Sequence, residues 1–285
     1  MLATIRSIAR VIKHSRLLPS SHSKIVNDNV CFVFGNGPSL AGDVEGHLDA
    51  LRLLDTCCVN QFCESILYTT IRPKIYVLAD PDYWIDEISA ELMQMRNRLV
   101  ECILKNTTWD LKFYVPFPAL DFFKNAFFSL ENIRVIGYNN VPLHGKSNVL
   151  HYLFDRGWGC PPAQNVLIAA LFITIRLNYK KIILLGADHS WHETLALDGD
   201  NRVCVKNNHF YNANAQLAPW TMGGKDDRIF TMGAIFFALA KMFNGYWRVR
   251  EYADYRGVEI VNASSLTYVD AFRRTSLSKV ISACD

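Results

Sequence analysis

VCFVFGNGPS, residues 30–39, is an apolar run that stops abruptly at a glycine turn. A short run of β-branched and aromatic residues is typical of a strand buried on both faces. Pro38 suits the first turn of a following helix, because its φ is fixed and it has no N–H to satisfy. The stretch therefore predicts a buried strand, a tight turn and a helix.

The same pattern recurs along the chain. Further short apolar runs predict strands over 56–59, 74–79, 112–115, 133–136, 181–185 and 258–261. Apolar residues at helical spacing predict helices over 40–51, 85–103, 166–177 and about 226–243. We expect 116–130 to be an aromatic-rich connection and find no clear period in 139–160. Apolar strands that alternate with helices predict a Rossmann-like α/β fold, with a mostly parallel sheet covered on both faces.

Residues 1–24 and residues 201–224 differ from this pattern. Residues 201–224 are polar and rich in Asn and Gly, which is typical of a lid or binding loop. We therefore predict a basic amphipathic helix and linker over 1–24, a single Rossmann-like domain over 25–285, and a small lid over about 189–224.

The composition narrows the class of protein. Half of the 285 residues are hydrophobic and the net charge is only +3, which argues against a nucleic-acid partner. The eight cysteines are scattered without C-x-x-C spacing, so we expect free buried thiols in the cytoplasm and not a zinc site. We find no stretch long and apolar enough to span a bilayer.

The first 18 residues suggest a helix with two faces. Leu2, Ile5, Ile8, Ala9 and Ile12 fall on one face, and Arg6, Arg10, Lys13 and Arg16 lie around the other. Such a helix can lie on the inner face of a membrane, drawn to anionic lipid. It can equally pack on its own domain or on a partner, including a second copy of the chain.

Small and polar residues follow the predicted strands, where ligands bind in parallel α/β sheets. They are Gly35-Asn36-Gly37-Pro38-Ser39, Asn60-Gln61, Asp80-Pro81-Asp82, Gly186-Ala187-Asp188 and Asn262-Ala263-Ser264. Glycines let a backbone approach phosphate, and Asn or Asp can bind ribose and base. The turn lacks the third glycine of a dinucleotide fingerprint and the Gly-Lys-Ser/Thr of a P-loop. We expect a nucleotide to contact Gly35, Asn36, Gly37, Ser39, Asn60, Asp80, Gly186 and Asp188.

The acidic and histidine residues leave alternatives open. Asp80 and Asp82 could hold Mg²⁺ or Mn²⁺ on a diphosphate, but Asp82 can also cap a helix that begins at Tyr83. His189 and His192 do not have zincin spacing. His209, in the polar loop, is the better candidate for a general base.

In this order the motifs resemble the donor half of bacterial sialyltransferases of glycosyltransferase family 42, over roughly residues 30–265. The resemblance is carried by VFGNGPSL at 33–40, VNQF at 59–62, Asp80-Pro81, Ala169-Ala170, KIILLGAD at 181–188 and NHFY at 208–211. The glycine turn and the Gly-x-Asp element also occur in the MptE-like pterin diphosphokinase group.

The resemblance implies one Rossmann-like domain with a small lid and a CMP-activated nonulosonic acid donor. It also implies inversion at the anomeric carbon without a required metal. By position, Asn36, Asn60 and Asp188 would contact the nucleotide, Ser39 would lie near phosphate, and His209 would deprotonate the acceptor.

The chain departs from the family in places. Asp80 stands where the family carries Asn, and His189 and Trp191 lie where it has phosphate-binding tyrosines. Tyr211 is a substitute for those tyrosines, and Arg156 is the matching charge before the helix at 166. Lys206 or a helix N-terminus could also balance the leaving phosphate.

Three functions follow as hypotheses. The first is a glycosyltransferase that modifies a bacterial surface glycan, such as a lipopolysaccharide. The second is an enzyme that uses Mg²⁺, either an MptE-like diphosphokinase with Asp80, Asp82 and Asp188 or a glycosyltransferase with Asp80 and Asp82. The third is a nucleotide-binding protein without catalysis, in which His209 is dispensable.

Overall fold

The structure is a computed structural model and describes residues 1–17, 30–206, 210, 216–221 and 228–282. Its centre is an eight-stranded sheet in the order β11-β10-β6-β1-β2-β3-β4-β5, and every neighbouring pair is parallel. The strands are β1 (Val30–Phe34), β2 (Asp55–Val59), β3 (Ile75–Val77), β4 (Leu111–Pro116), β5 (Ile133–Tyr138), β6 (Lys181–Leu185), β10 (Glu259–Asn262) and β11 (Arg273–Arg274). The predicted Rossmann-like α/β class is confirmed.

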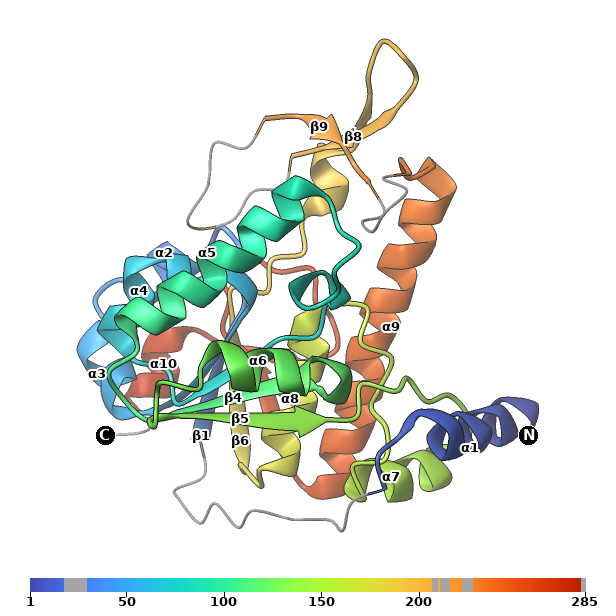
Figure 1. The fold of residues 1–285 in the computed structure, drawn as a ribbon, viewed down its shortest axis with the longest axis horizontal. Coiled ribbons are helices and arrows are strands. Elements are labelled where there is room, and N and C mark those ends of the chain that lie inside the picture. The colour runs from blue at the N-terminus through green and yellow to red at the C-terminus, as the bar shows by residue number, and fades with distance from the viewer. Residues whose placement is uncertain (18–29, 207–209, 211–215, 222–227, 283–285) are drawn as a thin grey trace.

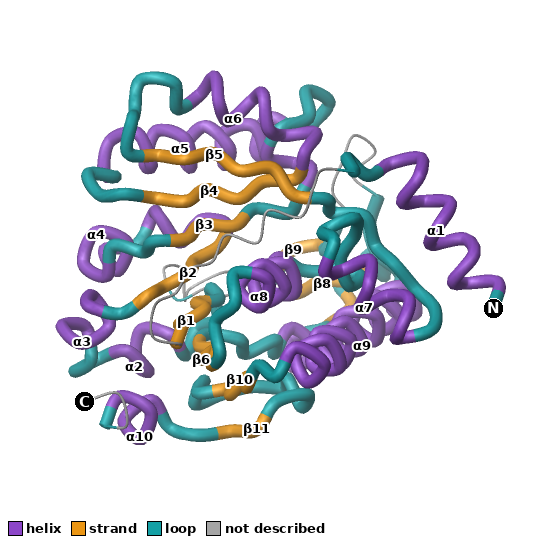
Figure 2. Tube along the Cα trace, turned by 90° about the horizontal axis from the view of Figure 1, so that it is seen from below, coloured by secondary structure: helices purple, strands orange, loops and turns teal. Residues whose placement is uncertain are grey.

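Helices cover both faces of this sheet (Figures 1 and 2). One face carries α7 (Ser147–Asp155), α8 (Val166–Arg176) and α9 (Met232–Arg256), with α1 (Leu2–His14) beside them. The other carries α2 (Leu40–Val44), α3 (Leu48–Leu53), α4 (Ile66–Ile71), α5 (Ala90–Asn106), α6 (Leu120–Ala126) and α10 (Leu277–Ile281). Short 3-10 helices are η1 (Asn60–Glu64), η2 (Pro81–Tyr83), η3 (Phe117–Ala119) and η4 (Trp191–Thr194).

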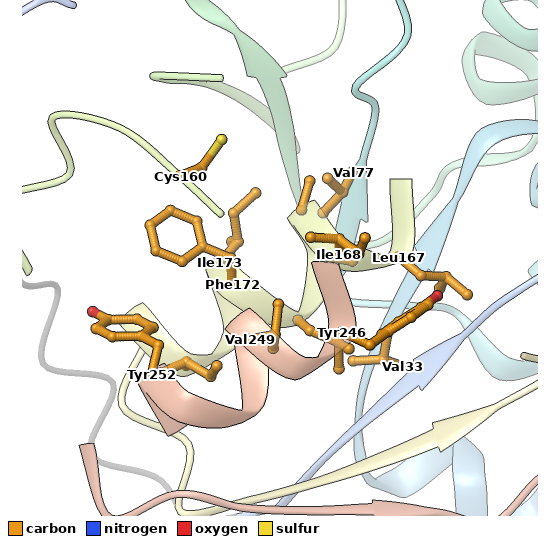
Figure 3. Close-up of a cluster of buried hydrophobic side chains, with 14 of the residues drawn as sticks. Val33, Val77, Cys160, Leu167, Ile168, Phe172, Ile173, Tyr246, Val249 and Tyr252 are labelled. Atoms are coloured by element: carbon orange, nitrogen blue, oxygen red, sulfur yellow. The ribbon is translucent and has the colours of Figure 1, made fainter. Parts of the chain in front are cut away.

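Strand β1 explains why its sequence is apolar without alternation. Cys31 and Val33 belong to the core under α8 and α9, whereas Phe32 and Phe34 belong to the core under α2 to α6. Both sets are buried because strand side chains alternate between the faces and both faces are covered. Figure 3 shows the first core, where side chains of α8 pack against those of α9.

The connection order fixes where a ligand can bind. From β1 the chain runs strand by strand to β5, then returns to place β6 on the other side of β1. The connections from β1 and from β6 therefore diverge onto opposite faces, which leaves a crevice at their carboxyl ends.

A second, antiparallel sheet lies within the range predicted for the lid. Its strands are β7 (Ala196–Leu197), β8 (Val203–Val205) and β9 (Ala218–Pro219), and Figure 1 shows β8 and β9 beyond the helical layers. The lid itself stays a prediction. In the described part of the chain, no helix is both long and apolar enough to cross a membrane.

Three predicted helices differ in extent. The one over 85–103 is α5, which starts at Ala90 because the Ser89 side chain caps it, and ends at Asn106. The one over 40–51 is divided into α2 and α3, because Gly46 between them adopts a φ of +79° that no helix contains. The one over 226–243 starts at Met232 and continues to Arg256, because the buried period runs on through Tyr246 and Val249.

Four short helices, α4, α6, α7 and α10, lie where none was expected. In α6, Leu120 and Phe123 are buried, so the aromatic-rich connection contains a short amphipathic helix. In α7, Leu150, Leu153 and Phe154 are buried at helical spacing, within a stretch that otherwise shows no period. Short helices with three apolar contacts carry a weak sequence signal.

Candidate functional site

A pocket of about 450 Å³ lies at the carboxyl edge of the sheet, where the connections that follow β1 and β6 diverge. Its size is that of an ordinary small-ligand site. Six of the residues expected to contact a nucleotide line it, namely Asn36, Gly37, Asn60, Asp80, Gly186 and Asp188. Gly35 and Ser39 are not part of its wall.

The glycines allow two backbone turns to touch. A Cβ on Gly35 would lie 2.4 Å from the carbonyl oxygen of Gly186, and one on Gly37 would lie 2.6 Å from the same oxygen. The Gly37 N–H donates to that carbonyl at 2.8 Å. Their small size therefore allows the close contact between the β1 and β6 turns, and the expected approach of a phosphate to this backbone stays a prediction.

Asp188 fastens this contact. Its carboxylate accepts hydrogen bonds from the Ser39 N–H at 2.9 Å and from the Ser39 hydroxyl at 2.8 Å. Burial raises the pKa of Asp188, and the two bonds from Ser39 oppose that rise. The first turn of α2 thus already holds an anion, which differs from the expected role of Ser39 beside a phosphate.

Two of the asparagines that line the pocket have a side-chain oxygen without a hydrogen-bond partner in the described part of the chain. The side-chain oxygens of Asn36 and Asn60 are buried and have no hydrogen-bond partner among the described residues. The Asn36 amide nitrogen donates to the Val59 carbonyl at 3.3 Å, and the Asn36 side-chain oxygen takes no part in this bond. Buried acceptors without a partner are costly, so both oxygens suit a ligand that brings donors.

Asp80 lines the pocket, and Asp82 does not. The expectation that Asp82 is the helix cap is wrong, because the Asp80 carboxylate accepts from the Asp82 N–H at 3.1 Å and so caps η2. Burial raises the pKa of Asp80. Within the described ranges no three His, Cys, Asp or Glu side chains are grouped as a metal site.

His189 forms part of the wall as a neutral group. Its Nε2 lies 2.6 Å from the Tyr246 hydroxyl, which in turn is 3.2 Å from the Asn165 amide nitrogen. Burial lowers the pKa of His189 to about 3. The ring is thus uncharged near neutral pH and is poorly suited to accept a proton during catalysis.

The first turn of α8 also forms part of the pocket wall. Asn165, Val166 and Leu167 line it, and the Asn165 side chain caps the helix by accepting from the Ile168 N–H at 3.2 Å. The first N–H groups of a helix have no partner within it and carry partial positive charge. We did not single out Asn165, although an Asn before an apolar helical run is a standard sign of a cap.

Lys206 brings the one positive side chain among the described lining residues. Its backbone N–H donates to the Thr194 hydroxyl at 3.2 Å, so the chain after β8 is attached to η4. Trp191, also in η4, adds an aromatic surface to the same wall. This wall therefore offers a cation and a flat apolar ring.

The expected catalytic residues fall into two groups. Arg156 lies outside the pocket, with its guanidinium over the rings of Tyr152 and Trp158. Its neighbour Gly157 abuts Arg176, at the end of α8 that is roughly 16 Å from the pocket. Arg156 therefore does not match the charge expected at the site.

His209 and Tyr211 lie outside the described residues. Phe210 between them is described, and its N–H donates to the Asn36 carbonyl at 3.2 Å. Its ring packs 5.6 Å from that of Phe62.

The cysteines take no part in this site. All those in the described ranges are free, and all but Cys102 are buried, as predicted. Burial raises the pKa of Cys57 and Cys58, which keeps these thiols protonated.

No protein-family model matches the chain, and no curated protein matches it. Among solved structures it is similar to the MAf glycosyltransferase from Magnetospirillum magneticum AMB-1, with a TM-score of 0.50 and 13% identity. The chain shares its fold with part of that protein. The match covers 96% of this chain but only 38% of that protein, so the likeness is one of fold over part of its length.

Proposed function

We propose that the chain is a glycosyltransferase that binds a nucleotide-activated sugar at the crevice between β1 and β6. The observation that carries this proposal is the pair of buried, unpartnered side-chain oxygens on Asn36 and Asn60, two residues that line the pocket together with the start of α8. Ribose hydroxyls and the amino group of cytosine are donors that would satisfy these oxygens. The fold likeness to a glycosyltransferase also supports it.

The phosphate would lie near the start of α8 and Lys206. The first N–H groups of α8 and the Lys206 ammonium offer positive charge there, whereas α2 is already capped by Asp188. We propose a CMP-linked nonulosonate as the donor and a bacterial surface glycan as the acceptor, on the basis of the family resemblance.

The chemistry needs a base and a stabilised leaving group. We propose that His209 takes the proton from an acceptor hydroxyl while its oxygen bonds to the anomeric carbon. The bond from that carbon to the phosphate oxygen breaks, and its electron pair leaves with CMP. Lys206 and the α8 amides would stabilise the charge that develops on this phosphate.

A thermal-shift panel of CMP, CDP, UDP, GDP and ATP, each with and without Mg²⁺, tests the proposed donor. We expect CMP or CDP to raise the unfolding midpoint without Mg²⁺, because nucleotide binding to the folded state stabilises it. Stabilisation by ATP with Mg²⁺ alone would reject the proposal in favour of a diphosphokinase.

Charge variants measured in the same way test where the phosphate binds. Lys206→Met should weaken CMP binding at least tenfold, since a charge-assisted hydrogen bond is worth about 1.5–3 kcal/mol. Lys180→Met is the matched control, because Lys180 is exposed just before β6, at the opposite edge of the sheet. Equal losses in both variants would show that the effect is general charge and not this contact.

A further inference from the structure

Helix α1 packs on the domain with its small and polar side. Thr4, Ser7 and Val11 are buried. The apolar side of the same helix faces outward, with Leu2 62%, Ile5 57%, Ile8 40% and Ile12 73% exposed. This is the reverse of an ordinary surface helix, which buries its apolar stripe against the core.

Specific hydrogen bonds hold the helix in this orientation. The Ser7 hydroxyl donates to the His144 carbonyl at 2.7 Å and accepts from the His144 N–H at 2.8 Å. The Lys146 N–H donates to the Thr4 hydroxyl at 3.1 Å. A Cβ on Gly145 would lie 2.4 Å from that hydroxyl, so the loop fits closely around Thr4. Rotating the helix to bury its isoleucines would break all of these contacts.

The apolar stripe has a basic border. At 100° per residue, Arg6, Arg10 and Lys13 fall between the exposed stripe and the buried side. Arg10 of α1 and Lys241 and Arg248 of α9 all act electrostatically on His144, which places positive charges of two helices around one loop. Lys241 also covers the ring of the exposed Phe237, with 4.3 Å from its Nζ to the ring centroid.

An apolar stripe bordered by cations fits one partner best. Acyl chains accept the isoleucines, and anionic headgroups accept the arginines and lysines at the same depth. We propose that the outward side of α1, made of Leu2, Ile5, Ile8 and Ile12 with its basic border, docks the protein on the surface of an anionic phospholipid bilayer. This proposal does not depend on the reaction proposed above.

The segment that follows α1 is attached next to a residue of the pocket wall. The Arg16 N–H, just after α1, donates to the Asn139 side chain at 2.9 Å, and the next residue, Asn140, lines the pocket. The loop that holds α1 thus also contributes to the pocket wall. A bilayer bound by α1 would bring membrane-borne molecules close to this edge of the sheet.

Co-sedimentation of the full chain with vesicles tests the proposal. The probes are vesicles of phosphatidylcholine alone and of phosphatidylcholine with a quarter of phosphatidylglycerol. We expect binding to the anionic vesicles and much weaker binding to the neutral ones. Replacing Arg6 and Lys13 by Gln should lower the affinity for anionic vesicles about fivefold for each charge removed.

The apolar contribution is tested separately. Ile5→Asp with Ile12→Asp should weaken binding to anionic vesicles at least ~tenfold, because two apolar side chains no longer enter the bilayer. Leu53→Asp is the matched control: Leu53 is 82% exposed at the end of α3, and Figure 1 shows α3 and α1 at opposite ends of the molecule. Unchanged unfolding midpoints in all variants would show that the effects are local.

Two outcomes would overturn the proposal. One is vesicle binding that is absent or that the isoleucine and Leu53 variants reduce equally. The other is a dimer by sedimentation velocity that the isoleucine variant dissociates, without vesicle binding, since a second copy would then cover the stripe. Neither outcome affects the nucleotide panel, so the two proposals fail independently.

Discussion

At the scale of single residues, the glycine turn is a packing device. Gly37 has no room for a side chain, because a Cβ there would lie 2.0 Å from the Asp188 carboxylate and 2.6 Å from the Gly186 carbonyl. Gly42, five residues later inside α2, has nothing within 4 Å of the same position. Two glycines that look alike in the sequence therefore differ in function.

Replacing each by alanine should separate them. Gly37→Ala should lower the free energy of unfolding by about 2 kcal/mol, because neither the backbone nor Asp188 can move without losing hydrogen bonds. Gly42→Ala should raise it by about 0.5–1 kcal/mol, since alanine favours a helix interior over glycine. Chemical denaturation measures both, and equal effects of the same sign would contradict this account.

Much of the site could be predicted at this scale, but not the role of each residue. Asn36, Asn60, Asp80 and Asp188 follow strands, and the structure brings them into one pocket. What each does depends on a partner distant in the sequence: Ser39 lies 149 residues from Asp188. Spacing along the chain has no information about that pairing.

At the scale of elements, α8 is where the core and the pocket meet. Its residues from Leu167 to Ile175 are all buried, so its position is fixed on every side. Its start is fixed by Asn165, which caps the helix and contacts Tyr246 from α9. A helix held in this way presents its first amides to the pocket at a fixed place.

Asn165→Asp separates the cap from the charge. Aspartate caps a helix as well as asparagine, so the unfolding midpoint should change by no more than a few degrees. The added negative charge at the α8 terminus should nevertheless weaken CMP binding at least tenfold, measured by calorimetry. Asn165→Ala should instead lower the free energy of unfolding by about 1 kcal/mol, because the cap is lost, and it adds no negative charge near the phosphate. Unchanged CMP affinity in the aspartate variant would place the phosphate elsewhere.

The elements that sequence identifies best are those buried on both sides. Strands β1 and β6 match their expected bounds, because a continuous apolar run has one interpretation between two helical layers. The short helices α6 and α7 were missed, because a few buried side chains over seven to nine residues give little period. Helix α9 was truncated at residue 243, where aromatic and charged residues hide the buried side.

At the scale of the whole molecule, the proposed reaction joins parts that are far apart in the chain. The glycine turn belongs to the start of the domain, and Phe210 reaches it through its hydrogen bond to Asn36. Sequence order alone predicted the parallel sheet and the edge that holds the pocket. It did not predict that Arg156 would lie at the far end of α8.

His209→Ala tests whether this convergence is catalytic. If His209 is the base, transfer from a CMP-linked donor to an acceptor should fall at least ~100-fold, whereas the CMP-induced rise in midpoint should stay the same. The Tyr211→Phe variant shows whether that hydroxyl assists the leaving phosphate. Full turnover by the alanine variant would remove His209 from the mechanism.

The contact between Gly37 and Gly186 also divides the pocket by stiffness. On that side, the turns that follow the central strands β1 and β6 are joined by a backbone hydrogen bond of 2.8 Å and reinforced by Asp188, so this wall is tied directly to the sheet. Another part of the wall, from Trp191 to Lys206, is held by strands of two and three residues. We therefore expect any widening of the pocket that admits or releases a ligand to come from the wall that carries Trp191 and Lys206.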